Sequence, residues 1–282
     1  MKNLLVRIIT AVILLPLVVA VFLAGGIFLK FLLLLASLIC VFEISTMVLP
    51  NSKIGLFTAF MAWFSLSLPS LCEASIHQNT AAAFLGFLCI NGLFLFVAEI
   101  EKSIFEKMST IFYFSSYVVL GLNCLFWLQN DSVSLNKSEG LAFILLTCIA
   151  TWGNDTCAYF GGRIFGKRPL FKSVSAKKTW EGFFFGAIGS LLLIFLIKKL
   201  TSLYNTPIFA QLDNADLLWV GIPAIIFAPL GDLIESKFKR IYQAKDSSNI
   251  LPGHGGLLDR IDALILVLPW TALYAFIIRP LC

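Results

Sequence analysis

Charged residues are scarce in this chain. They make up 13% of its 282 residues, whereas a soluble domain usually carries about 25%. Hydrophobic residues make up 59% and are spread along the whole length, with no polar stretch long enough to fold independently in water. These features exclude an ordinary soluble protein. They predict a single integral membrane domain over residues 1–282, with lipid as its main solvent.

Paired cysteine motifs are also missing. The seven cysteines form no CxxC pair, and most lie inside apolar runs, where cysteine behaves as a small hydrophobic residue. Nothing therefore indicates a zinc site or a disulfide framework. The chain also has no clear internal repeat and no low-complexity tract.

Long apolar runs take the place of the missing polar stretches. Each is close to the length of about 20 residues with which a helix crosses a bilayer. The runs are too long and unbroken for the alternating strands of a membrane barrel. The predicted fold class is therefore an all-α, polytopic transmembrane helix bundle. We predict about nine spans, over residues 8–24, 27–49, 56–71, 81–98, 111–128, 141–160, 183–197, 217–234 and 261–278.

Lys and Arg are distributed unevenly between the two sides of these spans. With the N-terminus inside, most of the 21 fall on inside segments, which is the pattern of cytoplasmic loops. Two long basic loops, residues 163–178 and 237–260, are then cytoplasmic, and the C-terminus is outside. Lys2 and Arg7 precede the first apolar run as in a signal peptide. Because no convincing cleavage site follows, we interpret this run as an uncleaved span.

Unusual polar residues are concentrated in the C-terminal half. Residues 1–128 are apolar and poor in motifs, whereas residues 141–282 carry nearly all the acids and bases that border apolar spans. The chain therefore divides into a motif-poor transmembrane half and a half in which we expect the chemistry and its cytoplasmic active-site loops.

The loop after the eighth span interleaves acids and bases. Asp232 lies near the end of one span, and Asp259 and Asp262 lie at the start of the next. Charged groups at such borders are costly unless they are paired or functional, and two carboxylates could jointly hold Mg²⁺. Glycines around His254 would let the backbone approach a phosphate. Four cations could neutralise phosphate oxygens, namely Lys239, Arg240, Lys245 and Arg260.

Simpler interpretations of the polar residues stay open. The positive-inside rule alone would explain the cations of both loops, but not the carboxylates at the helix ends. The basic loop before residue 180 could bind lipid headgroups, while Thr179 and Glu181 could also cap the seventh helix. Asp155, inside the sixth span, is a functional candidate that could instead pair with a cation. Glu43, in the second span, could serve a site or a polar partner between helices.

Residues 236–262 resemble the signature of the phosphatidate cytidylyltransferase (CDP-diacylglycerol synthase) family. That pattern is Ser-x-apolar-Lys-Arg, four residues, Lys-Asp-x-small, two residues, apolar-Pro-x-His-Gly-Gly-apolar-x-Asp-Arg-apolar-Asp, and this sequence fits every fixed position. Further segments are similar to family motifs, with Ala176 where proline is usual: Gly231-Asp232-Leu233, Lys177-Lys178-Thr179-x-Glu181-Gly182, and Asn154-Asp155 followed by Ala158. The resemblance covers residues 151–262 well.

The resemblance implies that CTP and phosphatidic acid give CDP-diacylglycerol and pyrophosphate, with Mg²⁺ as cofactor. It implies membrane lipid and no nucleic acid as partner, and a bacterial inner membrane as location; a homodimer stays open. Asp232 and Asp259 would hold metal, with Asp155 and Asp246 as further candidates. The expected catalytic residues are Lys239, Arg240, Lys245, His254 and Arg260. The expected substrate-binding residues are Lys177, Lys178, Thr179, Ser236, Gly255 and Gly256.

Two other functional classes compete with this interpretation. A transporter or lipid-binding membrane protein could use Asp155 and Asp232 along a substrate path, but the two halves of the chain do not look alike, as transporter repeats often do. A CTP-dependent lipid kinase would use a similar site. Enzymes that transfer phosphatidyl groups from CDP-diacylglycerol carry an Asp-Gly-x-x-Ala-Arg motif, and this chain contains no Asp-Gly dipeptide.

Overall fold

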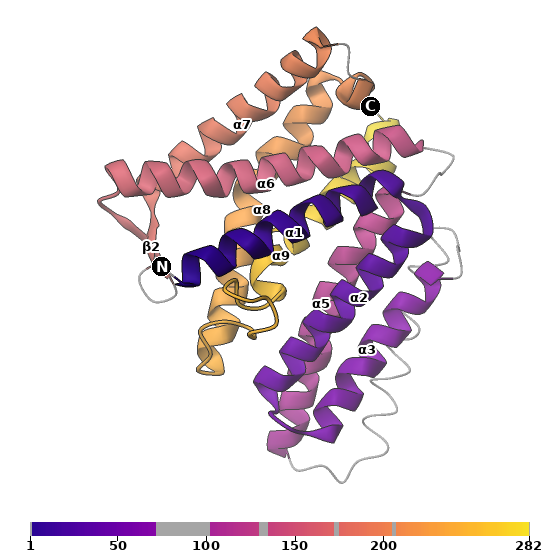
Figure 1. Ribbon diagram of the computed structural model, residues 1–282, viewed down its shortest axis with the longest axis vertical. Helices are drawn as coiled ribbons and strands as arrows, with labels where there is room; N and C mark the ends of the chain where they lie inside the picture. Colours follow the sequence, from indigo (N-terminus) through magenta and orange to yellow (C-terminus); the bar gives the residue numbers. More distant parts are fainter. Residues whose placement is uncertain (1, 72–101, 130–134, 172–174, 205–206, 282) are drawn as a thin grey trace. The chain divides into compact units, whose positions relative to one another are not determined.

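The computed structural model describes residues 2–71, 102–129, 135–171, 175–204 and 207–281. These residues are helical almost throughout and include one short hairpin (Figure 1). The elements are α1 (Lys2–Ala24), α2 (Gly26–Val48), α3 (Lys53–Leu71), α5 (Lys102–Gln129), α6 (Lys137–Phe165), β1 (Pro169–Phe171), β2 (Ser175–Thr179), α7 (Trp180–Leu203), a 3₁₀ turn (Pro207–Phe209), α8 (Asn214–Ile241), α9 (Leu258–Leu273), a π-helical turn (Tyr274–Ile278) and a 3₁₀ turn (Arg279–Leu281).

Six of the described helices are long and apolar enough to cross a membrane, judged by length and composition. They are α2, α5, α6, α7, α8, and α9 with its continuation to Ile278. Shorter apolar stretches lie in α1 and α3, and the predicted span over residues 81–98 lies outside the described residues. The chain is therefore an all-α, multi-pass membrane protein, and the count of about nine spans stays a prediction.

The chain divides into two compact units. Unit 1 comprises Met1–Phe126 and Tyr242–Arg260, and unit 2 comprises Trp127–Ile241 and Ile261–Cys282. Unit 1 is discontinuous in sequence, because the segment between α8 and α9 packs with the N-terminal helices. The single domain over residues 1–282 stays a prediction.

In unit 1, α2 packs against α3 (Figure 1), and α3 also contacts α5. Trp63 Nε1 on α3 donates to Ser37 Oγ on α2 at 2.9 Å. Asn123 Nδ2 on α5 donates to the carbonyl oxygen of Leu66 on α3, also at 2.9 Å. Helices in lipid gain little from hydrophobic association, so packing and interhelical hydrogen bonds of this kind hold them together.

In unit 2, α6 and α7 pack closely at positions occupied by small residues. A Cβ atom added to Gly186 would lie 2.6 Å from Asn154 Oδ1 and 3.0 Å from Ala158 Cβ on α6. One added to Gly182 would lie 2.8 Å from the carbonyl oxygen of Ala158. Glycine at these positions lets the two backbones approach, as in other small-residue contacts between membrane helices.

Gly186→Ala should therefore destabilise the protein, because the added methyl group has no room beside Asn154. Overpacking of this kind costs about 1–3 kcal/mol. The thermal midpoint of the detergent-solubilised protein, followed by tryptophan fluorescence, should fall. Ile188→Leu is the control, since Ile188 lies two residues away and its side chain is exposed. Equal midpoints for both variants would contradict the close packing of α6 and α7.

The end of α8 differs from the sequence-based prediction. The eighth span was expected over residues 217–234, with Ser236, Lys239 and Arg240 in a loop, and that expectation is wrong because α8 runs on to Ile241. Glu235 and Lys239 form an ion pair one turn apart at 2.6 Å, and basic residues in the last turn interact favourably with the helix dipole. The extension presents these side chains on a rigid helix.

The basic segment between α6 and α7 contains a hairpin that the sequence did not reveal. The strands β1 and β2 pair antiparallel, with Pro169 opposite Thr179 and Phe171 opposite Ser175. The hairpin connects the end of α6 to the start of α7 (Figure 1). It places Lys177 and Lys178 on β2, directly before the helix.

A polar cluster joins the starts of α6 and α8 to the C-terminal turns; we call its members, Glu139, Asp216, Tyr274 and Arg279, the Arg279 cluster. Asp216 is buried, and its Oδ1 accepts from Tyr274 at 2.9 Å and pairs with Arg279 Nε at 3.0 Å. Arg279 Nη1 also pairs with Glu139 Oε1 at 3.1 Å. The guanidinium thus connects two acids that lie on different helices.

Candidate active site

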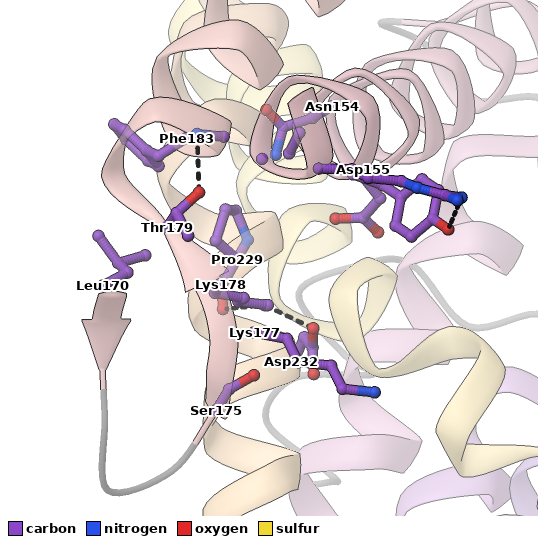
Figure 2. A pocket seen from close by; sticks show the side chains of 15 residues that line it. Asn154, Asp155, Leu170, Ser175, Lys177, Lys178, Thr179, Phe183, Pro229 and Asp232 are labelled. Atoms are coloured by element: carbon purple, nitrogen blue, oxygen red, sulfur yellow. Dashed lines mark hydrogen bonds and ion pairs between the residues drawn. The ribbon is translucent and has the colours of Figure 1, made fainter. Parts of the chain in front are cut away.

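A cavity of about 680 Å³ lies in unit 2 between α6, the hairpin, the start of α7 and the middle of α8. Its wall is mixed: Ala158, Leu170, Phe183 and Pro229 supply apolar surface, and side chains of both charges project among them (Figure 2). Its polar lining comprises Asn154, Asp155, Tyr159, Arg163, Ser175, Lys177, Lys178, Thr179 and Asp232. A cavity with this lining suits a ligand that has an anionic head and an apolar part.

Lys178 and Asp232 form an ion pair in the wall of the cavity (Figure 2). Lys178 Nζ on β2 lies 2.5 Å from Asp232 Oδ2 on α8 and 3.4 Å from the carbonyl oxygen of Pro229. Ser236, one turn along α8, donates to Asp232 Oδ1 at 3.1 Å. The structure thus brings together three residues that the sequence named as metal or substrate ligands, and it gives each of them a defined partner.

Asn154 and Asp155 reach the cavity from α6 (Figure 2). Asp155 is exposed there, whereas Asn154 is buried and its amide has no hydrogen-bond partner among the described residues. Buried polar groups usually have a partner. The amide of Asn154 is therefore a buried polar group without a partner in the described part of the chain, and its Oδ1 faces Gly186 of α7.

Thr179 and Glu181 fix the turn from β2 into α7. The hydroxyl of Thr179 accepts from the backbone N–H of Gly182 at 3.1 Å, so Thr179 is the helix N-cap. Glu181 instead accepts from the backbone N–H groups of Lys167 and Arg168. The capping that the sequence suggested for Thr179 is confirmed, and it orients the neighbouring lysine on β2.

Three acids gather beside the cavity. Asp232 and Glu235 on α8 and Asp262 on α9 each offer an oxygen within 4.8 Å of the others. Glu235 is buried and paired with Lys239, and Asp232 is paired with Lys178. We call these three residues the acidic cluster. Two of its acids therefore have cations beside them that can offset their charge.

The donors of the acidic cluster fit a hard divalent cation. Mg²⁺ prefers oxygen ligands and often binds through one or two carboxylates, with waters and phosphates in its remaining positions. Three carboxylates on two helices, close enough to share one ion, satisfy that requirement. A bound ion would compete with Lys178 for Asp232, so the lysine would become available to an anionic ligand.

The other half of the predicted site lies in unit 1, in the segment between α8 and α9. Leu251 and Gly255 form an isolated antiparallel bridge, with Leu251 N–H donating to Gly255 O at 2.9 Å. His254 lies in this turn, its N–H donating to Leu251 O, and its Nδ1 has no hydrogen-bond partner among the described residues. Gly255 has a φ of 82°, which disfavours residues with a Cβ atom.

Asp259, in the first turn of α9, binds backbone groups of the same segment. Its carboxylate accepts from Gly256 N–H at 2.9 Å and from Ser247 N–H at 3.0 Å. The carboxylate therefore holds the two ends of the turn against the helix. Its predicted role as a metal ligand is not tested by these contacts and stays a prediction.

Glu43 on α2 is completely buried and accepts four hydrogen bonds. Ser247 and Ser248 donate through their hydroxyl groups at 2.9 and 2.6 Å. Leu257 and Leu258 donate through their backbone N–H groups, both at 2.9 Å. The polar partner left open for Glu43 is thus the start of α9 and the segment before it.

Every predicted site residue lies within the described part of the chain, and the residues fall into two groups. Five of these predicted site residues have exposed side chains, namely Lys177, Arg240, Lys245, Asp246 and Arg260. The group in unit 2 comprises Asp155, Lys177, Lys178, Thr179, Asp232, Ser236, Lys239 and Arg240. The group in unit 1 comprises Lys245, Asp246, His254, Gly255, Gly256, Asp259 and Arg260.

The chain matches the model of the cytidylyltransferase family over residues 5–278. The chain belongs to the cytidylyltransferase family. It is 33% identical over 266 residues to a phosphatidate cytidylyltransferase of Staphylococcus epidermidis, a match that covers 94% of this chain and 96% of that protein. A Staphylococcus aureus phosphatidate cytidylyltransferase is 32% identical with the same coverage. The Bacillus subtilis enzyme of that name is 41% identical over 131 residues, or 46% of each chain.

In this cytidylyltransferase family member, the sequence singled out Asp232 and Lys178 but did not assign two nearby acids to a metal site. Glu235 and Asp262 were absent from the predicted metal ligands, although the structure groups both with Asp232. Their spacing carried a signal: Asp232 and Glu235 are three residues apart, as are Asp259 and Asp262, and residues three apart share one face of a helix.

Proposed function

We propose that this protein transfers the cytidylyl group of CTP to phosphatidic acid and so makes CDP-diacylglycerol and pyrophosphate for phospholipid synthesis. The cavity in unit 2 carries this proposal, because it combines Lys177, Lys178 and Asp232 with an apolar wall from α6, α7 and α8. The relatives that cover 94% of the chain bear the name of this activity, which supports the same reaction here.

The reaction joins two polyanions. An oxygen of the lipid phosphate attacks the α-phosphorus of CTP; a new P–O bond forms, the bond to the β-phosphate oxygen breaks, and pyrophosphate leaves with the electron pair. A phosphate monoester with a second pKa near 6 is largely dianionic at neutral pH, so the nucleophile needs no strong base. The main task is to position the phosphates and offset their charge.

The cations of the chain fit this task. Lys177 and Lys178 would bind a phosphate in the cavity, and Lys239 and Arg240 on α8 and Lys245 and Arg260 would contact the triphosphate or the lipid phosphate. Thr179 and Ser236 would position Lys178 and Asp232. Gly255 and Gly256 keep the turn around His254 narrow, and His254 would donate to a phosphate oxygen or to the leaving group.

Magnesium is the expected cofactor. The acidic cluster would hold it through Asp232, Glu235 and Asp262. Asp259, which the sequence pairs with Asp232 as a metal ligand, and the further candidates Asp155 and Asp246 stay predictions. The ion would offset the charge that develops on the phosphate oxygens. The carboxylates of the acidic cluster would bind this ion, and the neighbouring lysines would offset the remaining negative charge.

The proposal includes a location. Bacterial relatives support the inner membrane, and the excess of Lys and Arg on one side supports a cytoplasmic N-terminus, cytoplasmic basic segments and an external C-terminus. This orientation gives the site access to cytoplasmic CTP. A homodimer remains a prediction from the sequence.

A labelling experiment tests the reaction. Purified protein in detergent is supplied with phosphatidic acid, Mg²⁺ and CTP labelled at either the α- or the γ-phosphate. Cytidylyl transfer puts the α-label into lipid and releases the γ-label in pyrophosphate. Entry of the γ-label into lipid would instead identify a lipid kinase. If a folded preparation moves neither label, the proposal fails and a transport or binding role becomes the better explanation.

A further inference from the structure

Two carboxylates hold the segment between α8 and α9 in unit 1, and they do so from different helices. Asp259 of α9 accepts the backbone N–H groups of Ser247 and Gly256. Glu43 of α2 accepts the hydroxyl groups of Ser247 and Ser248 and two further backbone N–H groups. Ser247 is bound by both acids. We call this set of contacts the loop brace.

The four bonds to Glu43 require an acceptor. Each of its partners is used as a donor, and an ionised carboxylate has two oxygens that can accept about four hydrogen bonds in total and donate none. A glutamine in its place would turn an NH₂ group toward one backbone N–H, which cannot accept, and toward one serine hydroxyl, which would have to turn its proton away. Because Glu43 is completely buried, water could not easily replace the lost bonds.

A neighbouring glycine shows how closely the segment is fitted to Glu43. A Cβ atom added to Gly256 would lie 2.8 Å from both carboxylate oxygens of Glu43 and would collide with Ser247 Oγ. The absence of a side chain at Gly256 therefore makes room for the loop brace. The sequence suggested a different reason for this glycine, close approach to a phosphate, which remains a prediction.

The segment that Glu43 holds carries several of the residues proposed for the reaction. Lys245 and Asp246 directly precede Ser247, the turn with His254 lies between the two braced ends, and Asp259 follows Leu258. We infer that Glu43 is a positioning residue for the reaction, which fixes this segment through Ser247, Ser248 and the first N–H groups of α9. This inference rests on the proposed function; Glu43 itself need not touch a substrate.

The first test compares Glu43→Gln with Glu106→Gln in the full-length protein. Glu106 is an exposed acid on α5 of the same unit, so it controls for the loss of one charge. Hydrogen exchange of peptides covering residues 245–258 should become at least about tenfold faster in Glu43→Gln, while peptides of α5 keep their protection. The kcat/KM for CTP should fall about 100-fold in Glu43→Gln and stay unchanged in Glu106→Gln.

A conservative variant of Glu43 and a double-mutant cycle distinguish a positioning role from a general structural role. Glu43→Asp keeps an acceptor-only carboxylate, so it should recover kcat/KM to within about tenfold of the wild type. Ser247→Ala with Ser248→Ala should lower activity by itself. Because these hydroxyl groups act through Glu43, the same pair of changes should add little to Glu43→Gln in a double-mutant cycle.

Three outcomes would overturn the inference. They are wild-type activity in Glu43→Gln, loss of protection throughout α2 and α5 instead of in residues 245–258 alone, and strictly additive effects in the cycle. A wrong assignment of the proposed function would give a different set of results. In that case the wild-type protein transfers no cytidylyl group, while the exchange experiment still reports whether Glu43 holds the segment.

Discussion

Asp232→Asn is expected to lower kcat/KM for cytidylyl transfer by about 100- to 1000-fold, the range seen when a group that stabilises transition-state charge is removed. Asp232 belongs to the acidic cluster and is also the partner of Lys178. The amide keeps the size of the side chain but loses its charge. Both proposed tasks, binding of a cation and alignment of the lysine, are then impaired together. The α-phosphate label assay measures the change.

Asp213→Asn is the matched control for this substitution. Asp213 is an exposed acid near the other end of α8, and its Oδ1 accepts from the N–H of Asp216. Asparagine can make the same cap, so activity should stay within about twofold of the wild type. A double-mutant cycle with Lys178→Met should show coupling between Lys178 and Asp232. Near-normal turnover in Asp232→Asn would refute its proposed role.

Arg279→Met should lower the free energy of unfolding by about 3 kcal/mol or more, because removal of one partner leaves a buried charge uncompensated. Asp216 is only 1% exposed. After the substitution, the carboxylate of Asp216 would still accept from the Tyr274 hydroxyl and from the backbone N–H of Asp213. It would lose the guanidinium that offsets its charge. Glu139 would lose the cation beside its Oε1 in the same step and would keep the N–H of Asn136 on its Oε2. Denaturant unfolding in detergent, followed by tryptophan fluorescence, measures the loss.

The double variant Arg279→Met with Asp216→Asn distinguishes a buried charge from a simple loss of packing. Replacement of both charges is often far less harmful than removal of one, so the double variant should regain at least about half of the stability lost by Arg279→Met. If the double variant is as unstable as the sum of the two single changes, the Arg279 cluster does not act as a charge pair. Activity is not expected to report on this cluster, because none of its members lines the cavity.

The sequence singled out several charged residues that line the cavity, among them Lys178 and Asp232, because they lie at the borders of apolar runs. The approach of Lys178 to Asp232 spans only about 50 residues, and both border apolar runs, where an unpaired charge is costly. The apolar runs themselves located the helices that the structure describes. The helix ends were harder, since α8 continues through Lys239 and Arg240, which a hydropathy pattern assigns to the loop.

Long-range polar contacts could not be predicted in this way. Glu43 and Ser247 are 204 residues apart in sequence, and Ser247 Oγ lies 2.9 Å from Glu43 Oε2 in the structure. A single acid in an apolar run indicates only that some partner exists; the identity of that partner depends on the three-dimensional fold. The same holds for Arg279, which reaches Asp216 and Glu139 from the far end of the chain. The hairpin was missed because its strands are only three and five residues long.

The discontinuity of unit 1 has a consequence for biosynthesis. A chain is synthesised from its N-terminus at about 5–20 residues per second, so α2 enters the membrane well before Tyr242–Arg260 leaves the ribosome. During that interval Glu43 is an acid in an apolar helix whose donors do not yet exist, and such a residue is costly in lipid. We therefore expect the N-terminal helices to complete their polar contacts only after residues 242–260 have been synthesised. A chain that stops before residue 242 should be recognised as incomplete and degraded by membrane quality control.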